Sequence, residues 1–408
     1  MMTTTIKPYL IRLTPVGSFF FGGEKNLAGA GNANYFVRSR HFPQQTSLLG
    51  LLRMQLLSAY DMLPEPYLGR AIANPVEAKD KIGGNGFRHN QSTAYGEIHA
   101  LGPVLLARGD EFFAPMAFSS EIHFSEKEGR FASVLAENDF GNVRTYLPTL
   151  KDFSPKKTPP EQVYGSAGSP SMALQEIFRE KTRVGITKNK KHFPWLYADE
   201  KTKNNGEAEM EGFFKQVSLY FNNEAGKKPW QFAFAAWLGE AAGGKLMAFA
   251  AENPIVWFGG ERSAFRFEMS APENLPDFTP AFPIQEKGLL RLVLLSDAWA
   301  KPGEVYPHCQ FAHAETQEFR FLKSEVDDTK NYYQRGDNTN SGESIVRSDR
   351  HTLVSRGSVF FCQEDQLENL KQALEKPIDF RRIGYNAFTV LKGQVETNFF
   401  IPTSSPSL

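Results

Sequence analysis

The chain has 408 residues, 41% of them hydrophobic and 35 of them phenylalanine, which suits two domains or one elaborated domain with a well-packed core. Its 46 basic and 46 acidic residues cancel, which excludes a global field that would draw the whole protein to nucleic acid or membrane. Two cysteines exclude a disulfide framework, the N-terminus has no apolar signal core, and glycine and charge interrupt the apolar stretch 230–251. We therefore expect a cytoplasmic protein without a membrane span.

Strand and helix patterns alternate through the first half. An apolar run bounded by proline and glycine predicts a strand over 6–17, and a leucine stripe predicts a helix over 42–60 that Thr46 or Ser47 would cap. The glycine-rich segment 19–41 between them is expected to be a loop. Further along we expect two strands within 97–118, a helix over 171–180 and a strand over 213–221. Segment 230–238 fits a strand, with a buried helix as the alternative, and 254–268 has a strand–glycine–strand pattern.

The second half begins again after a linker at 274–283. A buried strand is predicted over 288–300, and segment 357–393 then combines a strand, a helix and a glycine loop. Both halves fit the βαββαβ ferredoxin-like unit, an antiparallel sheet with helices on one face. We expect an α+β protein of two such domains, 1–285 and 286–408, with insertions at 199–230 and 324–350.

Two glycine loops carry the first candidate chemistry. Glycine lets backbone amides approach a phosphate, arginine supplies a planar fork for it, and tyrosine can stack on a base. The loops are "FGGERSAFR", with Gly259, Gly260 and Arg262, and "RRIGYNAF", a glycine-rich loop near the C-terminus with Arg382, Gly384, Tyr385 and Asn386. The alternative is a hairpin turn with solvated charges, which is favoured for either loop taken alone.

Two basic segments are further candidates. Arg38, Arg40 and His41 precede a helix N-terminus whose free amides favour anions, and Arg53 lies inside that helix. Segment 179–192, which includes Arg183, holds six Lys or Arg against one Glu, with aromatic residues following. Basic residues interleaved with aromatics suit single-stranded nucleic acid, and a solvated surface loop is the alternative in both cases.

The sequence offers little for catalysis. His308, Cys309 and His313 lack a second cluster that would complete a metal site, and no nucleotide-binding or hydrolase motif is present. We therefore expect no metal, no cofactor and no enzymatic activity. His41 acting as a general base on an RNA 2′-hydroxyl is the one catalytic alternative.

In order along the chain, the motifs resemble those of the repeat-associated mysterious proteins (RAMPs) of CRISPR effector complexes. They are "LIRLTPVGSFFFGG", "FPQQTSLLGLLR", "LGPVLLARGDEFFAPMAF", "TRVGI", "WFGGERS", "LRLVLLSDAWAKPG", "LVSRGSVFF" and "RIGYNAF". The combination is most similar to the third subunit of the type III-B Cmr module, in the five-prime-handle-binding RAMP group.

That resemblance implies two RRM-related ferredoxin-like domains and a non-catalytic subunit that binds the 5′ handle of the CRISPR RNA. It implies neighbours as well: the large Cas10-type subunit and the backbone RAMP subunits, with target RNA met indirectly. Carried over by motif, the RNA contacts would be Arg38, Arg40, His41, Arg53, Arg183, Arg262, Arg356 and the loop Arg382–Asn386. A type III-D subunit, a metal-independent RAMP endoribonuclease using His41, and a pure protein scaffold stay open as alternatives.

Overall fold

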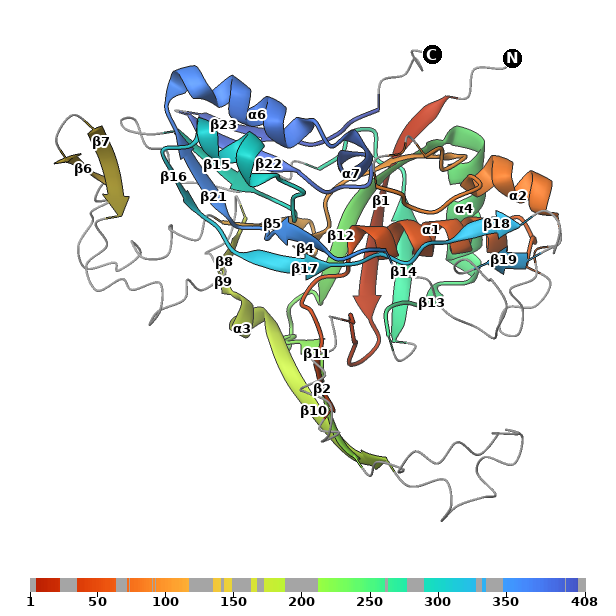
Figure 1. Cartoon of the computed structure of the whole chain (residues 1–408). Coiled ribbons are helices and arrows are strands. Elements are labelled where there is room, and N and C mark those ends of the chain that lie inside the picture. The colour runs from red at the N-terminus through yellow and green to blue at the C-terminus, as the bar shows by residue number, and fades with distance from the viewer. Residues whose placement is uncertain are drawn as a thin grey trace, which may run out of the picture.

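The computed structural model describes residues 5–22, 35–63, 72, 74–89, 91, 93–116, 135–140, 143–148, 163–166, 172–187, 212–260, 263–276, 290–327, 332–334, 348–392 and 394–402. In these residues the protein is a mixed α+β structure built on two antiparallel sheets (Figure 1). Within the same residues, no helix is both long and apolar enough to cross a membrane.

The strands of the larger sheet all lie before residue 271, in the order β13-β14-β1-β12-β4-β5-β8-β9, with β3 also paired to β12. They are β1 (Ile6–Pro15), β3 (Ile98–Leu101), β4 (Leu105–Arg108), β5 (Glu111–Pro115), β8 (Val163–Gly165), β9 (Met172–Ala173), β12 (Trp230–Gly239), β13 (Ile255–Trp257) and β14 (Ala264–Ser270). Helix α1 (Gln45–Ala59) lies between β1 and β3 along the chain, and α4 (Glu240–Glu252) follows β12 and leads through the short strand β13 into β14. Helix α2 (Pro75–Ile82) packs beside α1.

Alternation along β1 decides which face of this sheet the helices cover. Tyr9, Ile11 and Leu13 are buried in one hydrophobic cluster with the leucines of α1 and with Leu246 of α4. Leu10 points to the opposite face and belongs to a separate cluster. Because side chains alternate with a period of two in a strand, Arg12 lies on the same face as Leu10, away from the helices.

The smaller sheet lies entirely after residue 289, in the order β16-β21-β15-β22-β23. Its strands are β15 (Leu290–Leu294), β16 (Phe311–His313), β21 (Val359–Cys362), β22 (Phe388–Lys392) and β23 (Gln394–Asn398). Between them come α5 (Pro302–Val305), the 3₁₀ turns η4 (Tyr306–His308) and η5 (Glu364–Gln366), α6 (Leu367–Glu375) and α7 (Ile378–Arg381).

The central strand order is the same in both sheets. In the larger sheet, β14-β1-β12-β4 places the first strand between the last and the third, with α1 and α4 in the two crossover positions. In the smaller sheet, β22-β15-β21-β16 repeats that order, with α5 and α6 in the crossovers.

The remaining described strands form one three-stranded sheet and three two-stranded pairs. The three-stranded sheet has the order β10-β11-β2, with β10 (Phe178–Thr187), β11 (Gly212–Phe221) and β2 (Tyr35–Arg38). The one-turn helix α3 (Leu174–Ile177) precedes β10 in the chain. Two-stranded pairs are β17 (Thr316–Phe319) with β20 (His351–Val354), β18 (Glu325–Asp327) with β19 (Tyr332–Gln334), and β6 (Leu135–Phe140) with β7 (Val143–Pro148).

Most predicted elements are confirmed. Within 97–118 the structure has three strands, β3, β4 and β5, where two were expected, and three further predictions are wrong. The 42–60 helix forms, but it begins at Gln45 after an N-cap at Gln44, so neither Thr46 nor Ser47 caps it. The expected loop 19–41 contains β2, which pairs in parallel with β11. The expected helix 171–180 is one turn long, because from Phe178 onward the chain pairs with β11 over ten residues. Sheet pairing with a distant strand overrides local helix propensity there.

Candidate nucleic-acid interface

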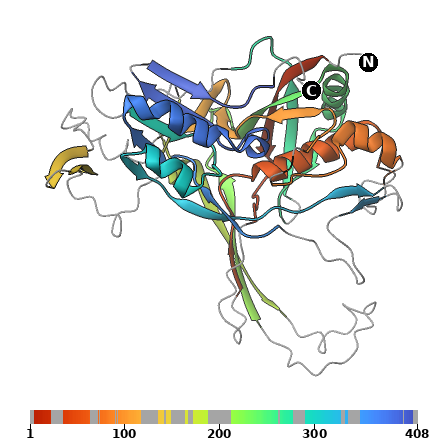
Figure 2. The ribbon, with the colours of Figure 1, turned by 45° about the horizontal axis from the view of Figure 1, so that its top comes forward.

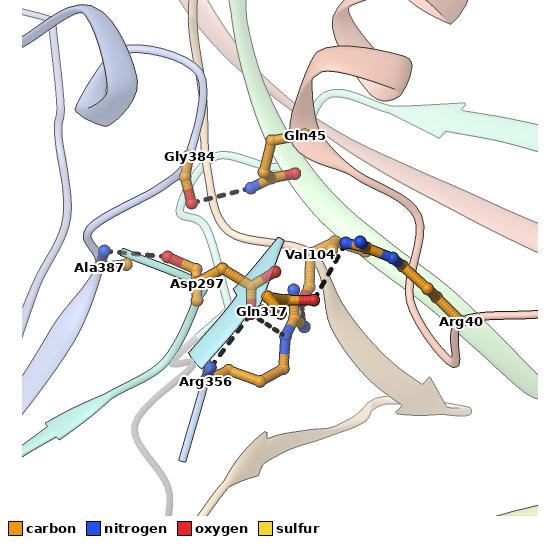
Figure 3. Close-up of polar contacts among 9 residues, drawn as sticks. Arg40, Gln45, Val104, Asp297, Gln317, Arg356, Gly384 and Ala387 are labelled. Atoms are coloured by element: carbon orange, nitrogen blue, oxygen red, sulfur yellow. Dashed lines mark hydrogen bonds and ion pairs between the residues drawn. The ribbon is translucent and has the colours of Figure 1, made fainter. Parts of the chain in front are cut away.

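The loop "RRIGYNAF" lies against the larger sheet instead of facing solvent. Gln45, at the start of α1, donates from Nε2 to the carbonyl oxygen of Gly384 at 2.8 Å (Figure 3) and to that of Gly102 at 3.0 Å. Gly384 has a φ of +91°, and a Cβ atom at that position would lie 2.1 Å from Gln45 Nε2. This glycine therefore serves a close approach between two parts of the chain.

The side chains of Tyr385 and Asn386 are also buried. Tyr385 is buried, with its ring 5.6 Å from those of Phe319 and Phe380, and burial raises the pKa of its hydroxyl. Asn386 is fully buried; its side chain accepts from the Trp299 amide and donates to the carbonyl oxygens of Trp299 and Leu374. In this arrangement neither side chain presents a surface on which a base could stack.

Three predicted arginines bind carbonyl oxygens of the chain itself. Arg382 donates to the carbonyl oxygens of His99, at 2.7 Å, and Thr93, at 2.9 Å, and burial lowers the pKa of its guanidinium. Arg356 is 4% exposed and donates from Nη1 to the carbonyl oxygen of Val104 (Figure 3). Arg53 is buried and donates to the carbonyl oxygen of Gly83 and to Ser324.

The Gly259–Gly260 loop packs on the segment that follows β1. The Gly260 amide donates to the carbonyl oxygen of Phe20 at 2.7 Å. Gly259 has a φ of +82°, and a Cβ atom there would lie 2.7 Å from the same oxygen. The predicted contact Arg262 lies outside the described residues.

Arg40 and His41 lie at the entry to α1. Arg40 donates to Gln317 Oε1, at 3.0 Å, and to the carbonyl oxygen of Glu318, at 2.6 Å, which ties this entry to β17. The His41 ring packs edge-on against Phe178 at 5.0 Å. Burial, helped by the nearby charge of Arg38, lowers the pKa of His41 to about 4, so this imidazole is neutral at pH 7 and a weak base.

The three strands β10, β11 and β2 form an arm that projects from the rest of the described chain (Figures 1 and 2). Its base is anchored in the main hydrophobic cluster by Phe178, Leu219 and Phe221. Phe19 exchanges two backbone hydrogen bonds with Leu219, of 2.7 and 2.9 Å. The arm is therefore continuous with the core at its base, while the distal side chains of β10 are exposed.

One face of the arm carries a row of basic side chains. Arg179, Lys181 and Arg183 alternate along β10 and so point to the same side, and all three are exposed. Their partners across the ladder are Tyr220, Ser218 and Gln216, which carry no negative charge. We call these six residues the basic face of the arm.

The opposite face is electrostatically mixed. Arg38 of β2 forms an ion pair with Glu180 of β10. Lys215 lies over the exposed ring of Phe36, with its Nζ 5.5 Å from the ring centroid, and faces Val184 across the ladder. With its acidic residue paired to an arginine, this face offers less uncommitted positive charge than the basic face.

An exposed row of cations at two-residue spacing beside a tyrosine is suited to a single-stranded nucleic acid. The cations would contact successive phosphates, and Tyr220 would offer a ring face to a base. The structure thus brings Arg183 together with Arg179 and Lys181, which our site prediction omitted although the basic composition of 179–192 contained the signal. It does not bring the arm together with Arg356 or Arg382, which lie at the junction of the two sheets.

Residues 11–392 match the family model described as CRISPR-associated protein (Cas_Cmr3). The chain belongs to this family. The resemblance to the third Cmr subunit is therefore confirmed for nearly the whole length of this Cas_Cmr3-family chain.

Comparison with solved structures and with curated proteins gives weaker evidence of relationship than the family model. A chain of the cryo-electron microscopy structure of the type III-B Cmr-beta complex bound to cognate target RNA is 12% identical, with a TM-score of 0.41, over 96% of this chain and 99% of that chain. A chain of the Csm3–Csm4 subcomplex of the type III-A interference complex is 9% identical, with a TM-score of 0.35, over 97% and 100%. No curated protein matches. These likenesses are loose, and the membership of the Cas_Cmr3 family rests on the family model.

In the described part of this Cas_Cmr3-family chain, no three His, Cys, Asp or Glu side chains are grouped as a metal site would require. His313, from the cluster considered in the sequence, is partly buried, which lowers the pKa of its imidazole. Burial also raises the pKa of the neighbouring Cys309 thiol to about 12, so this cysteine is protonated at neutral pH.

Proposed function

We propose that this chain is a non-catalytic subunit of a type III-B CRISPR effector complex and that it holds the 5′ handle of the CRISPR RNA on the basic face of its arm. The observation that carries the proposal is the exposed row of Arg179, Lys181 and Arg183, faced across the ladder by neutral residues. Such a row supplies local positive charge in a chain whose net charge is zero.

The repeated strand order supports a second part of this proposal. An order in which the first strand lies between the last and the third, with helical crossovers, is the arrangement of a ferredoxin-like βαββαβ unit. We propose two such RRM-related domains, 1–285 and 286–408. The buried residues Arg53, Arg356, Arg382 and Tyr385 then hold the two domains together, whereas Asn386 bonds within the second domain. In this proposal none of the five contacts RNA.

The remaining predicted contacts have different roles in this proposal: one contacts RNA directly, and the others lie elsewhere on the arm or shape the loops near its base. Arg183 contacts the RNA backbone directly, and Arg38, which is 58% exposed, lies on the other face of the arm. Arg40 and His41 shape the entry to α1, and Gly259 and Gly260 shape the loop beside the arm's base. In the assembled particle, which would act in the cytoplasm in antiviral defence, the chain joins the large Cas10-type subunit to the RAMP backbone and meets target RNA indirectly.

The geometry does not favour the endoribonuclease alternative. A general base must reach the proton it removes and must bind it well enough at the working pH. The His41 ring packs on Phe178, and its pKa is lowered to about 4.

The test uses the assembled complex with a CRISPR RNA that carries a photoreactive group within its 5′ handle. Peptides are mapped by mass spectrometry for the wild type and for the triple variant Arg179→Ser, Lys181→Ser and Arg183→Ser. We expect handle crosslinks within 179–183 or 215–220 in the wild type, and their loss in the variant.

The matched control removes the same charge elsewhere, with Lys301→Ser, Arg350→Ser and Lys376→Ser, whose side chains are 59, 56 and 67% exposed. The control should crosslink like the wild type. Handle crosslinks confined to neighbouring subunits would contradict the proposal and identify the chain as a protein scaffold.

A further inference from the structure

A hollow of about 530 Å³ opens on the face of the larger sheet that the helices leave uncovered. Its walls come from β1, from the β4–β5 turn, from the segment entering β12, and from β14 with the residues after it. The apolar part of the lining is Leu10, Phe112, Pro229 and Pro276, and the polar part is Arg12, Asp110, Lys228, Gln231 and Ser270. The volume falls in the range of small-molecule sites, which combine apolar walls with a few converging polar groups.

Arg12 is held in place by one end of its guanidinium. Its Nη1 donates to the carbonyl oxygen of Gly109, at 2.6 Å, and to Gln231 Oε1, at 3.0 Å. Gln231 is fixed in turn, because its Nε2 donates to Thr14 Oγ1 at 2.7 Å. The Arg12 guanidinium also lies 5.2 Å from the centre of the Phe112 ring.

These contacts leave the other donors of Arg12 uncommitted. Within the described residues, its Nη2 and Nε have no hydrogen-bond partner. A positioned guanidinium with a free edge matches the geometry of a phosphate or carboxylate, and prior positioning lowers the entropy cost of binding.

Two more charged groups around the hollow are unused in the described part of the chain. Lys228 is exposed and has no ion-pair partner there, although its neighbour Lys227 pairs with Glu224 at 2.7 Å. The Asp110 carboxylate, in the β4–β5 turn, likewise has no partner there. The hollow therefore offers two cationic donors, one anionic acceptor and an apolar floor.

We propose that this hollow binds a nucleoside monophosphate. The phosphate lies on Arg12 and Lys228, Asp110 accepts from a ribose hydroxyl or a base amine, and the base packs on Leu10, Phe112 and Pro276. A simple anion would leave Asp110 and the apolar floor without a role, whereas a nucleotide uses all three kinds of group. The same chemistry is presented by a free mononucleotide and by the phosphorylated end of an RNA strand, and the site is independent of the arm.

The experiment titrates the full-length protein with adenosine 5′-monophosphate by calorimetry and compares Lys228→Ala with Lys227→Ala. Both lysines are exposed and adjacent, but only Lys228 lines the hollow. We expect Lys228→Ala to weaken binding about tenfold, as expected for the loss of one charge-assisted contact, and Lys227→Ala to bind like the wild type. Photolabelling with 8-azidoadenosine monophosphate should mark peptides within 105–116 or 226–231.

Further arms separate the ligand classes. Adenosine and inorganic phosphate should each bind at least tenfold more weakly than the nucleotide, because each leaves part of the lining unused. A 5′-phosphorylated tetra-adenylate that binds tighter than the mononucleotide identifies an RNA end as the source, and equal affinity identifies a free nucleotide. Equal loss in the two lysine variants, or phosphate binding as tightly as the nucleotide, would overturn the proposal.

Discussion

Arg356 donates a hydrogen bond from Nη1 to the carbonyl oxygen of Val104, 3.0 Å away in space and 252 positions earlier in the chain. The same guanidinium lies 4.0 Å from the centre of the Phe42 ring, and its Nε is 3.6 Å from Asp297 Oδ1. One side chain from the second half thus contacts the entry to α1, the approach to β4 and the turn after β15.

Arg356→Ala should lower the free energy of unfolding by about 3 kcal/mol, because it leaves the Asp297 carboxylate without its buried ion-pair partner. Denaturant unfolding of the purified chain measures the change. Arg350→Ala is the control: this exposed arginine pairs with Glu318 at 3.1 Å, and such pairs contribute about 0–1 kcal/mol. Equal stability of the two variants, with handle binding lost only in Arg356→Ala, would make Arg356 an RNA contact.

Two adjacent glycines of α4 should respond to alanine with opposite signs. At Gly244 a Cβ atom meets nothing within 4 Å, so Gly244→Ala should stabilise the protein by about 0.5–1 kcal/mol through helix propensity. At Gly243 the Cβ would lie 2.2 Å from Cζ of Tyr9, so Gly243→Ala should destabilise by about 1–3 kcal/mol. Thermal unfolding of both variants is the measurement, and a shift of the same sign in both would refute the packing of α4 on β1.

Charge on the basic face should be visible in the salt dependence of RNA binding. Each phosphate contact on a single strand contributes a slope of about 0.7 to the plot of log affinity against log salt concentration. Lys181→Ala should reduce that slope by about this amount when a fluorescent handle RNA is titrated at several salt concentrations. Lys301→Ala should leave the slope unchanged; an unchanged slope in Lys181→Ala would remove this lysine from the interface.

His41 should make the protein less stable in mild acid. The pKa of His41 in the folded state is lowered from 6.5 to about 4. Between these two values the imidazole therefore binds a proton in the unfolded chain but not in the folded protein. The stabilisation is complete above pH 6.5 and is lost as the pH falls toward 4, by a total on the order of 3 kcal/mol.

Unfolding midpoints at pH 7.5, 5.5 and 4.5 test this prediction in the wild type and in His41→Gln. The difference between the two proteins should change across this range, since glutamine does not titrate. His308→Gln provides a histidine substitution at a different place in the fold. A pH profile of His41→Gln that parallels the wild type would show that His41 titrates normally.

The strands that were predicted correctly have a hydrophobic pattern that can be recognised within their own residues. The apolar runs that became β1, β12 and β15 are recognisable because their side chains face a core on at least one side. The start of strand β10 was assigned to a helix because its stabilising partner, β11, begins more than twenty residues after β10 ends, and no local signal marks such a pairing.

The glycine loops illustrate a different limit. Arginine beside glycine predicted a phosphate held at close range, and in the structure the Arg382 guanidinium donates to carbonyl oxygens of the chain itself. A phosphate and a backbone carbonyl both accept hydrogen bonds from arginine, so the motif alone could not distinguish RNA from the chain's own peptide groups. Only the tertiary structure identifies His99, Thr93 and Val104 as the acceptors.

Those three carbonyls have a consequence for synthesis of the protein. They are translated long before Arg356 and Arg382, whose guanidinium groups they bind in the finished fold. While the ribosome is still adding the second half, the segment 93–104 has only water as a partner for these oxygens. The first half therefore reaches its final packing only after residue 382 has left the exit tunnel.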